Sequence, residues 1–365
     1  MAYYIRLAAS RQGVDRRAAG DRGNMEVRRG ESAAPDEDGH GGGAGASWGF
    51  RVTYGPGSRR GVVRTKPDQT VHFLDVCALD VTKRTDDHLK AHPDKEAMAA
   101  CLRQLDLPTN RFSCLLALME KTSDTTSRQS DDELRAQIVD DIEHMRRFFQ
   151  NAADGEPNEY VEDYIRQLRR LPAELARPIY LSFLHTANEA RFGLHQPIAK
   201  PKRPKIASIL LELADSLGIR RQHPVVVVTL VCLYGNGAAR DVLKFTPKSE
   251  AFPAENVLAD LMAIGRFAIR KLELEQDYWL GLSYVRHAAY ITRDKGLAEV
   301  MACFHAKGLT TRDADAHQEL IIRLTVDFAD LLTEISHEPG PLLDRSDPRS
   351  ARLSEYDRVC ALVFG

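Results

Sequence analysis

Two short apolar segments, each closely followed by an aspartate, constrain the fold of this chain more than any other feature of its sequence. Residues 71–74 lead directly into Asp75, and residues 288–292 are followed by Asp294. Both segments have the length and composition of short buried strands. In an open α/β sheet, ligands bind beyond the carboxyl ends of the strands, so we expect both aspartates at the functional edge of such a sheet.

Helical patterns dominate the rest of the chain. Asp94 is predicted to cap a helix that ends at Leu105, and residues 130–222 are predicted to be helical throughout. That stretch begins with a capping box of Ser130 and Glu133, which an apolar stripe follows at helical spacing. Further helices, within this stretch and beyond it, are expected over residues 160–168, 178–190, 206–217, 253–272 and 297–306.

Residues 225–234 form the longest apolar run of the chain. Its valines favour a strand, but the apolar pattern continues at helical spacing to Leu243, which favours a broken helix. Gly235 and Gly237 lie at the break, and Arg240 stands where a dinucleotide-binding fingerprint would have its third glycine, so a helix break explains the segment better. Residues 319–328 alternate as an outer strand does.

The two ends of the chain are predicted to lie outside the folded domain. Residues 1–68 bury too little apolar surface to offset their chain entropy, so we expect a disordered tail or a segment that precedes the true start of the protein. Residues 339–365, which begin with two prolines around a glycine, are expected to form a C-terminal tail. This leaves one α/β domain over residues 69–338, with residues 130–222 as a helical insertion.

Composition narrows the class of protein. The 365 residues carry a formal net charge of −2, which argues against a uniformly basic surface but leaves nucleic-acid binding open, because binding depends on where the charge lies. The six cysteines are scattered and have no partners at zinc-ligand spacing, so we expect reduced cysteines in a cytoplasmic protein. No signal peptide and no apolar run of roughly 20 residues is apparent, and no membrane partner is expected.

Two further acids interrupt apolar helical segments. Glu120 follows residues 114–119, and Asp260 lies within residues 257–264, one helical turn after Asn256. A buried carboxylate is costly unless it is paired or binds a cation. Because no Cys or His stands at ligand spacing, converging carboxylates favour a hard ion such as Mg²⁺ or Mn²⁺. Such an ion can activate water against a phosphodiester.

Each of these acids also has an interpretation without function. Asp75 and Asp294 can cap the turn or helix that follows them, as aspartates commonly do. Glu120 can be solvated or pair with an arginine. Asp260 can form an ion pair with a nearby cation, and the candidates are Arg266 and Lys271.

Taken in order, the four acids resemble the pattern of the PIN-domain family of metal-dependent ribonucleases. The resembling segments are residues 71–79, 113–120, 256–261 and 291–297. This family has an acid after the first strand, one on an early helix, one on a late helix and one after the fourth strand. Asp75, Glu120, Asp260 and Asp294 match these positions in turn. The family usually has Thr-Asn after the first acid, whereas this chain has Val-Cys, ending at Cys77.

The resemblance implies a three-layer α/β/α domain with a mainly parallel central sheet. It also implies cleavage of single-stranded RNA with one or two Mg²⁺ or Mn²⁺ ions. We expect Asp75 and Asp294 to be the primary metal ligands, and Asp260 and Glu120 to hold a second ion or its waters. The expected supporting residues, which would orient a ligand or a phosphate or supply a hydroxyl, are Asn256 and Thr292.

The main alternative is a catalytically inactive PIN-like or helical module that binds RNA or a protein partner. Its binding surface would lie in residues 130–222, where prolines in residues 200–205 are expected to hold basic side chains extended and exposed. The candidate nucleic-acid contacts are Lys200, Lys202, Arg203 and Lys205. A haloacid-dehalogenase-like phosphatase is disfavoured because Cys77 stands where that family needs a second acid. An enzyme requires all four acids to converge, whereas a binding module requires only the basic face.

Overall fold

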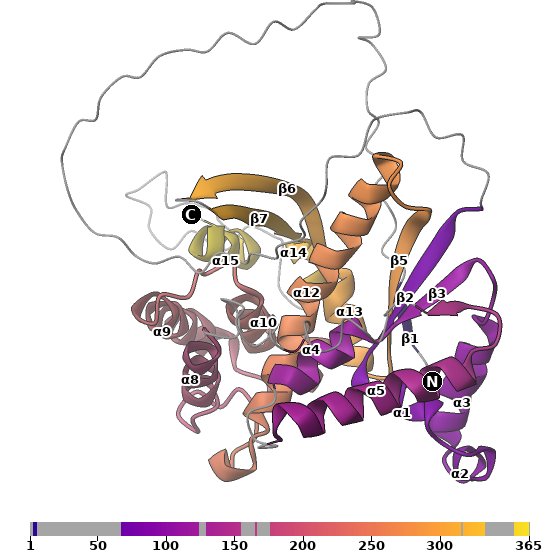
Figure 1. The fold of residues 1–365 in the computed structure, drawn as a ribbon. Helices are drawn as coiled ribbons and strands as arrows, with labels where there is room; N and C mark the ends of the chain where they lie inside the picture. Colours follow the sequence, from indigo (N-terminus) through magenta and orange to yellow (C-terminus); the bar gives the residue numbers. More distant parts are fainter. Residues whose placement is uncertain are drawn as a thin grey trace, which may run out of the picture.

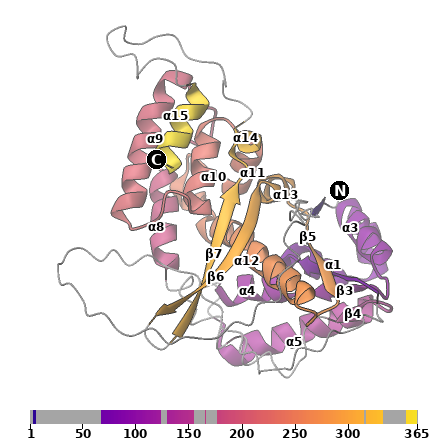
Figure 2. The ribbon, with the colours of Figure 1, turned by 90° about the horizontal axis from the view of Figure 1, so that it is seen from above.

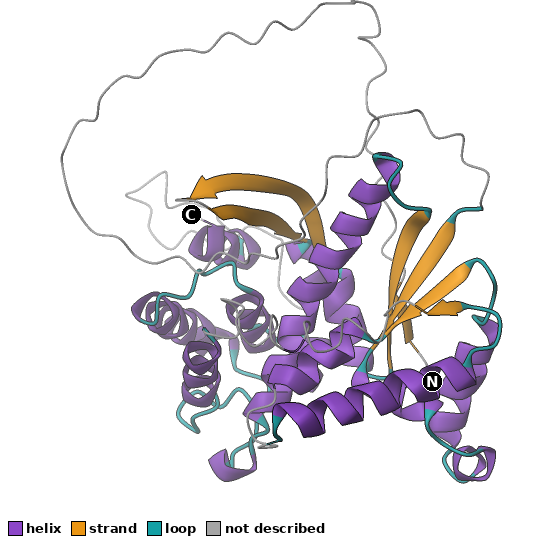
Figure 3. Cartoon of the chain, viewed as in Figure 1, coloured by secondary structure: helices purple, strands orange, loops and turns teal. Residues whose placement is uncertain are grey.

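The computed structural model describes residues 3–5, 67–123, 129–154, 165, 176–314, 317–332 and 354–364. Within them the chain is a mixed α/β protein that is mostly helical (Figure 3). The predicted α/β class and the mainly parallel sheet are therefore confirmed at this level. None of the described helices is long and apolar enough to cross a membrane.

The main sheet has the strand order β1-β5-β2-β3-β4. The strands are β1 Tyr3–Ile5, β2 Gln69–Leu74, β3 Asn110–Ser113, β4 Ala153–Asp154 and β5 Val285–Thr292. Strand β2 pairs in parallel with both β3 and β5, and β1 closes one edge in the antiparallel direction. Leu74 pairs with Ile291, so the carboxyl ends of β2 and β5 lie side by side, as the two strand-like segments predict.

One face of the sheet packs on helices that precede and follow β3. Leu74, Phe112 and Ile291 point into this core, where they join buried residues of the helices. These helices are α1 Val76–Thr82, α3 Pro93–Gln104 and α5 Asp131–Phe148, with α2 Asp86–Lys90 beside them. The predicted capping box begins α5, and its apolar stripe is the face that packs.

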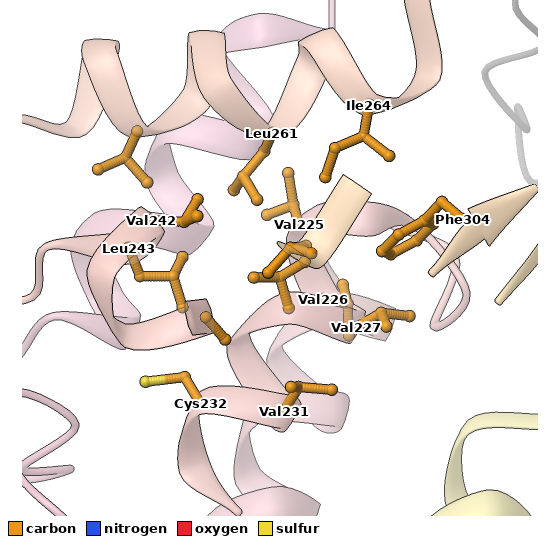
Figure 4. Packing of buried hydrophobic residues seen from close by; sticks show 14 of the residues in the cluster. Val225, Val226, Val227, Val231, Cys232, Val242, Leu243, Leu261, Ile264 and Phe304 are labelled. Atoms are coloured by element: carbon orange, nitrogen blue, oxygen red, sulfur yellow. The ribbon is translucent and has the colours of Figure 1, made fainter. Parts of the chain in front are cut away.

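The other face packs on a larger helical core. Val71, Phe73 and Tyr290 join it from the sheet. The helices nearest to them are α4 Leu115–Ser123 and α12 Ala254–Trp279, and α12 runs along the sheet in Figure 1. Behind α12 lies α10, Pro224–Leu233, in which every residue is buried. Burial on all sides explains why a valine-rich run is a helix here, as Figure 4 shows for its packing against α11, α12 and Phe304.

The remaining elements surround α10 and α12, as the view from above shows (Figure 2). The helices are α8 Arg177–Ala187, η2 Lys200–Lys202, α9 Arg203–Ser216, α11 Gly237–Leu243, η3 Ser249–Ala251, α13 Lys295–Ala302, α14 Phe328–Leu331 and α15 Glu355–Phe364. A separate hairpin consists of β6 Phe304–Ala314 and β7 His317–Val326.

The structure corrects the predicted domain boundaries. The expected N-terminal tail is wrong for residues 3–5, because these residues form β1 of the main sheet. Residues 6–66 lie outside the described part of the chain. The expected C-terminal tail is wrong for α15, which contributes Val359 and Val363 to the core. Residues 130–222 are not one helical insertion, because α5 covers the sheet and β4 extends it.

Several element boundaries also differ from the sequence-based predictions. His92 occupies the N-cap position of α3 without a side-chain hydrogen bond, and Pro93 is the first helical residue, so Asp94 is not the cap. The helix expected over residues 297–306 ends at Ala302, because the chain then enters β6. Strand β7 pairs with β6 and is not an outer strand of the main sheet. The helix expected over residues 160–168 lies outside the described residues, except for Ile165.

Candidate functional site

Asp75 stands at the point where β2 ends and α1 begins. Its backbone N–H donates to the Ile291 carbonyl at 3.1 Å, which holds it against the neighbouring strand. Its carboxylate caps α1 by accepting from Ala78 N–H, and it also accepts from the Thr292 hydroxyl. Burial raises the pKa of Asp75 to about 6, although these hydrogen bonds lower it, and the Asp260 carboxylate raises it further.

Asp294 follows the adjacent strand β5 and begins α13. Its carboxylate accepts from Leu297 N–H at 2.8 Å, so the capping interpretation holds for Asp294 as it does for Asp75. Thr292, fully buried at the end of β5, accepts from Asp294 N–H at 3.0 Å while its hydroxyl donates to Asp75. One threonine therefore connects the two strand-end aspartates.

Glu120 and Asp260 approach the same place from two helices, α4 and α12, that pack on each other. Burial raises the pKa of Glu120 to about 7, the Asp260 and Asp75 carboxylates raise it further, and Arg266 opposes them. Burial also raises the pKa of Asp260, and so does Asp294. We call Asp75, Glu120, Asp260 and Asp294 the acid cluster.

The neighbouring side chains of Tyr290 and Cys77 respond to the same charges. Burial raises the pKa of Tyr290 well above its ordinary value, and Asp75, Glu120 and Asp260 raise it further. Burial and the same three carboxylates raise the pKa of the Cys77 thiol to about 11. Both groups are affected by the same three acids, so these acids, from three different elements, lie in one region of the molecule.

Lys244 is a cation in direct contact with the acid cluster, and no pattern in the sequence indicates it. Its ammonium lies 3.0 Å from an Asp260 oxygen and 3.8 Å from an Asp294 oxygen. Burial disfavours the charged ammonium, but these two carboxylates outweigh burial and raise the pKa of Lys244. The alternative of an ion pair between Asp260 and Arg266 or Lys271 is wrong. Asp260 pairs with Lys244, and Lys271 pairs with Glu275 at 3.3 Å.

The helices around the acid cluster approach very closely at Gly296. A Cβ atom there would lie 2.8 Å from the Ala238 carbonyl oxygen and 2.9 Å from the Asp241 Cβ. The first turn of α13 therefore rests directly on α11, whose last residue precedes Lys244. This contact sets the distance between the Asp294 carboxylate and the Lys244 ammonium.

The acid cluster suits a hard cation by the chemistry of its donors. Carboxylate oxygens are the ligands that Mg²⁺ and Mn²⁺ prefer, and the pKa of Glu120 is raised by burial and by Asp260 and Asp75 although nearby cations oppose this rise. In the part of the chain that the structure describes, however, no group of three or more His, Cys, Asp or Glu side chains has the arrangement of a formed metal site. Oxygens of Asp75 and Asp294 accept from helix N-termini, and an oxygen of Asp260 accepts from Lys244.

The predicted supporting and nucleic-acid-binding residues lie in different settings. Asn256 is exposed on α12, one turn before Asp260. Residues 200–205 are not extended, because η2 and the start of α9 contain them, and α9 packs on α10 away from the sheet (Figures 1 and 2). The side chains that are exposed there are Lys200, Lys202 and Lys205.

Arg203 contradicts the expectation of a nucleic-acid contact. Its residue surface is only 7% exposed, and its Nε donates to the Ile198 carbonyl at 2.9 Å. Its Nη1 lies 3.7 Å from Glu355, so the guanidinium ties α9 to α15. Arg203 is therefore a structural residue, because its charged group is committed within the protein.

The glycines before α11 have a local role. Asn236 between them caps α11 by accepting from Ala239 N–H at 2.7 Å, and its amide donates to the Leu331 carbonyl at 2.8 Å. The preceding element is the helix α10, whereas a dinucleotide fingerprint would follow a strand. The helix break expected from the sequence is confirmed.

The four acids of the cluster lie on, or just after, four different helices and strands. Asp75 follows β2, Glu120 lies on α4, Asp260 lies on α12 and Asp294 follows β5. Comparison of the chain with protein-family models, with curated proteins and with solved structures finds no match. The likeness to the PIN-domain family therefore depends on these four acids and their positions alone.

Proposed function

We propose that this protein is a divalent-metal-dependent nuclease, with the acid cluster as its metal site and single-stranded RNA as the first substrate to test. We further propose that its layers correspond to the three-layer arrangement of PIN-like domains. One observation carries the proposal: carboxylates from separate elements meet at the carboxyl ends of two adjacent parallel strands, where burial and mutual repulsion raise the pKa of Asp75 and Glu120.

The residues of the acid cluster and their neighbours would have different roles in metal binding. When bound, a Mg²⁺ or Mn²⁺ ion supplies an activated water and stabilises charge on the phosphoryl oxygens. Asp75 and Glu120 would hold the ion, and both must lose their protons to do so. Thr292 fixes Asp75 and the backbone of Asp294 relative to each other. The Lys244 ammonium keeps Asp260 and Asp294 in place.

The direct test is cleavage of a panel of end-labelled RNA and DNA strands in Mn²⁺. We expect the wild-type protein to cut single-stranded RNA and the Asp75→Asn variant to be inactive, because the amide cannot replace an anionic ligand. Asp87→Asn is the matched control, since the Asp87 side chain is 98% exposed on α2. Equal cleavage by the wild-type and Asp75→Asn proteins would refute the assignment.

A second candidate is a non-catalytic module that binds RNA, and a specific observation favours it. Lys244 already neutralises part of the acid cluster, and its partner Asp260 is turned toward a protein donor. This candidate predicts no Mn²⁺ binding at the acid cluster, together with RNA binding that weakens when Lys200, Lys202 and Lys205 are replaced by Gln. Gel-shift titration at two salt concentrations, beside the cleavage assay, separates the two functions.

A further inference from the structure

We propose that Lys244 is a built-in cation that takes the place of a metal ion between Asp260 and Asp294. This inference rests on the proposed function and deepens it. It makes Lys244 a positioning residue for the two acids that it contacts. Its ammonium would also meet an anionic phosphate oxygen of the substrate.

The Lys244 ammonium lies close to two acids of the cluster. Lys244 reaches two carboxylates from two different elements, α12 and the start of α13, at 3.0 and 3.8 Å. A single metal ion bridging two acidic residues would have to occupy this same space between them. The Lys244 side chain remains 41% exposed, so a phosphate from solvent can approach the ammonium.

The backbone of Lys244 has a conformation that is unusual for its residue type. It is the C-cap of α11 with φ 49° and ψ 30°, and it is the only non-glycine residue with positive φ in the described part of the chain. Glycine is the usual residue at such a left-handed cap, because a Cβ atom is unfavourable there. A long charged side chain at a backbone position that suits glycine indicates that the side chain itself has a role.

The test compares Mn²⁺ binding by the full-length wild-type protein and by Lys244→Gly. Glycine suits the backbone of residue 244, so the variant removes the ammonium with little risk to folding, and Lys244→Ala checks that the result does not depend on glycine. The matched control is Lys295→Ala, because Lys295 lies on α13 near the cluster but pairs with Glu299 at 3.5 Å. Calorimetric titration and Mn²⁺ electron paramagnetic resonance give the number of ions bound and their affinity.

We expect Lys244→Gly to bind one Mn²⁺ ion more than the wild type or to bind Mn²⁺ about tenfold more tightly, as removal of a nearby unit charge implies. The metal-induced rise in melting temperature should grow accordingly, and Lys295→Ala should match the wild type. Identical number and affinity of bound ions in the wild type and both Lys244 variants would overturn the role of Lys244 and leave the metal site standing.

Two other results separate this inference from the proposed function. Mn²⁺ binding by Lys244→Gly but not by the wild type would support Lys244 as the cation of the site and overturn the metal-dependent nuclease. An absence of Mn²⁺ binding in every variant, with intact folding, would overturn both.

Discussion

Asp141 and Asp75 are both buried acids, but the protein surrounds their carboxylates in opposite ways. The Asp141 side chain on α5 is fully buried, and the ammonium groups of Lys83 and Lys121 both bind it. Asp75 is nearly as buried, but its partners are the backbone N–H groups of Ala78 and Arg293 and the Thr292 hydroxyl, with another carboxylate nearby. A buried acid with matched cations is structural, whereas a buried acid among other acids indicates a place for a missing cation.

The largest test of this contrast is removal of the structural acid. Asp141→Ala leaves two partly buried lysines facing each other without an anion, so we expect a loss of about 3 kcal/mol in the free energy of unfolding. Urea denaturation measures it. Asp140→Ala, at an exposed neighbouring position on α5, is the control and should change stability little. Equal effects of the two substitutions would mean that Asp141 does not hold α5 in place.

The packing around the acid cluster is tested by Gly296→Ala. The added Cβ atom would lie 2.8 Å from the Ala238 carbonyl oxygen, so we expect a loss of about 2 kcal/mol and a displaced Asp294. Gly265→Ala on α12 is the matched control, because nothing lies within 4 Å of its added Cβ and alanine favours a helix. Thermal denaturation should show opposite shifts for the two variants. A stabilised Gly296→Ala would contradict the close approach of α13 to α11.

The pH dependence of stability tests whether Asp75, unlike Asp141, lacks a matched cation. The pKa of Asp75 is about 6 in the folded protein and near 3.8 in the unfolded chain, so the folded state binds the proton more tightly. Stability from this group is therefore present at low pH and is lost as pH rises from about 4 through 6. Asparagine keeps the helix cap and carries no charge, so we expect Asp75→Asn to gain on the order of 2 kcal/mol at pH 8 without metal.

Denaturation curves of the wild type and Asp75→Asn from pH 4 to pH 8 provide the measurement, and Asp87→Asn should follow the wild type throughout. A loss of stability in Asp75→Asn at pH 8 would show that the charged carboxylate is already balanced, like that of Asp141.

The smallest expected effect concerns the link between the two strand-end aspartates. Thr292→Val removes the hydroxyl that donates to Asp75 and the oxygen that accepts from Asp294 N–H, at nearly constant volume. We expect a loss of about 1 kcal/mol in stability and a further rise in the pKa of Asp75. Carboxyl titration by nuclear magnetic resonance would detect the rise, and an unchanged pKa would remove Thr292 from the site.

The features predicted from the sequence are those with local signals. An apolar run that ends in an acid defined β2 with Asp75, and the same pattern placed Asp294 after β5. Glu120 and Asp260 were recognised because each interrupts an apolar helical segment. The capping box of α5 follows from two residues close in sequence, Ser130 and Glu133.

The features that were missed depend on contacts between distant segments. Strand β1 pairs with β5 almost a whole chain length away, and no local pattern in Tyr3–Ile5 indicates this partner. Lys244 reaches Asp260 because α11 ends in a left-handed residue, which its sequence does not favour. The prolines around Arg203 predict an extended and exposed side chain, but in the folded protein α15 places Glu355 beside it.

Calorimetric titration of Mn²⁺ into the metal-free protein at pH 8 tests most directly whether the acid cluster is a cation site. The account predicts saturable binding to the wild type, binding of similar strength to Asp87→Asn, and none to Asp75→Asn while that variant remains folded. Binding of equal strength to all three proteins would place the ion elsewhere, and it would leave the acids of the cluster without the cation that their burial and repulsion imply.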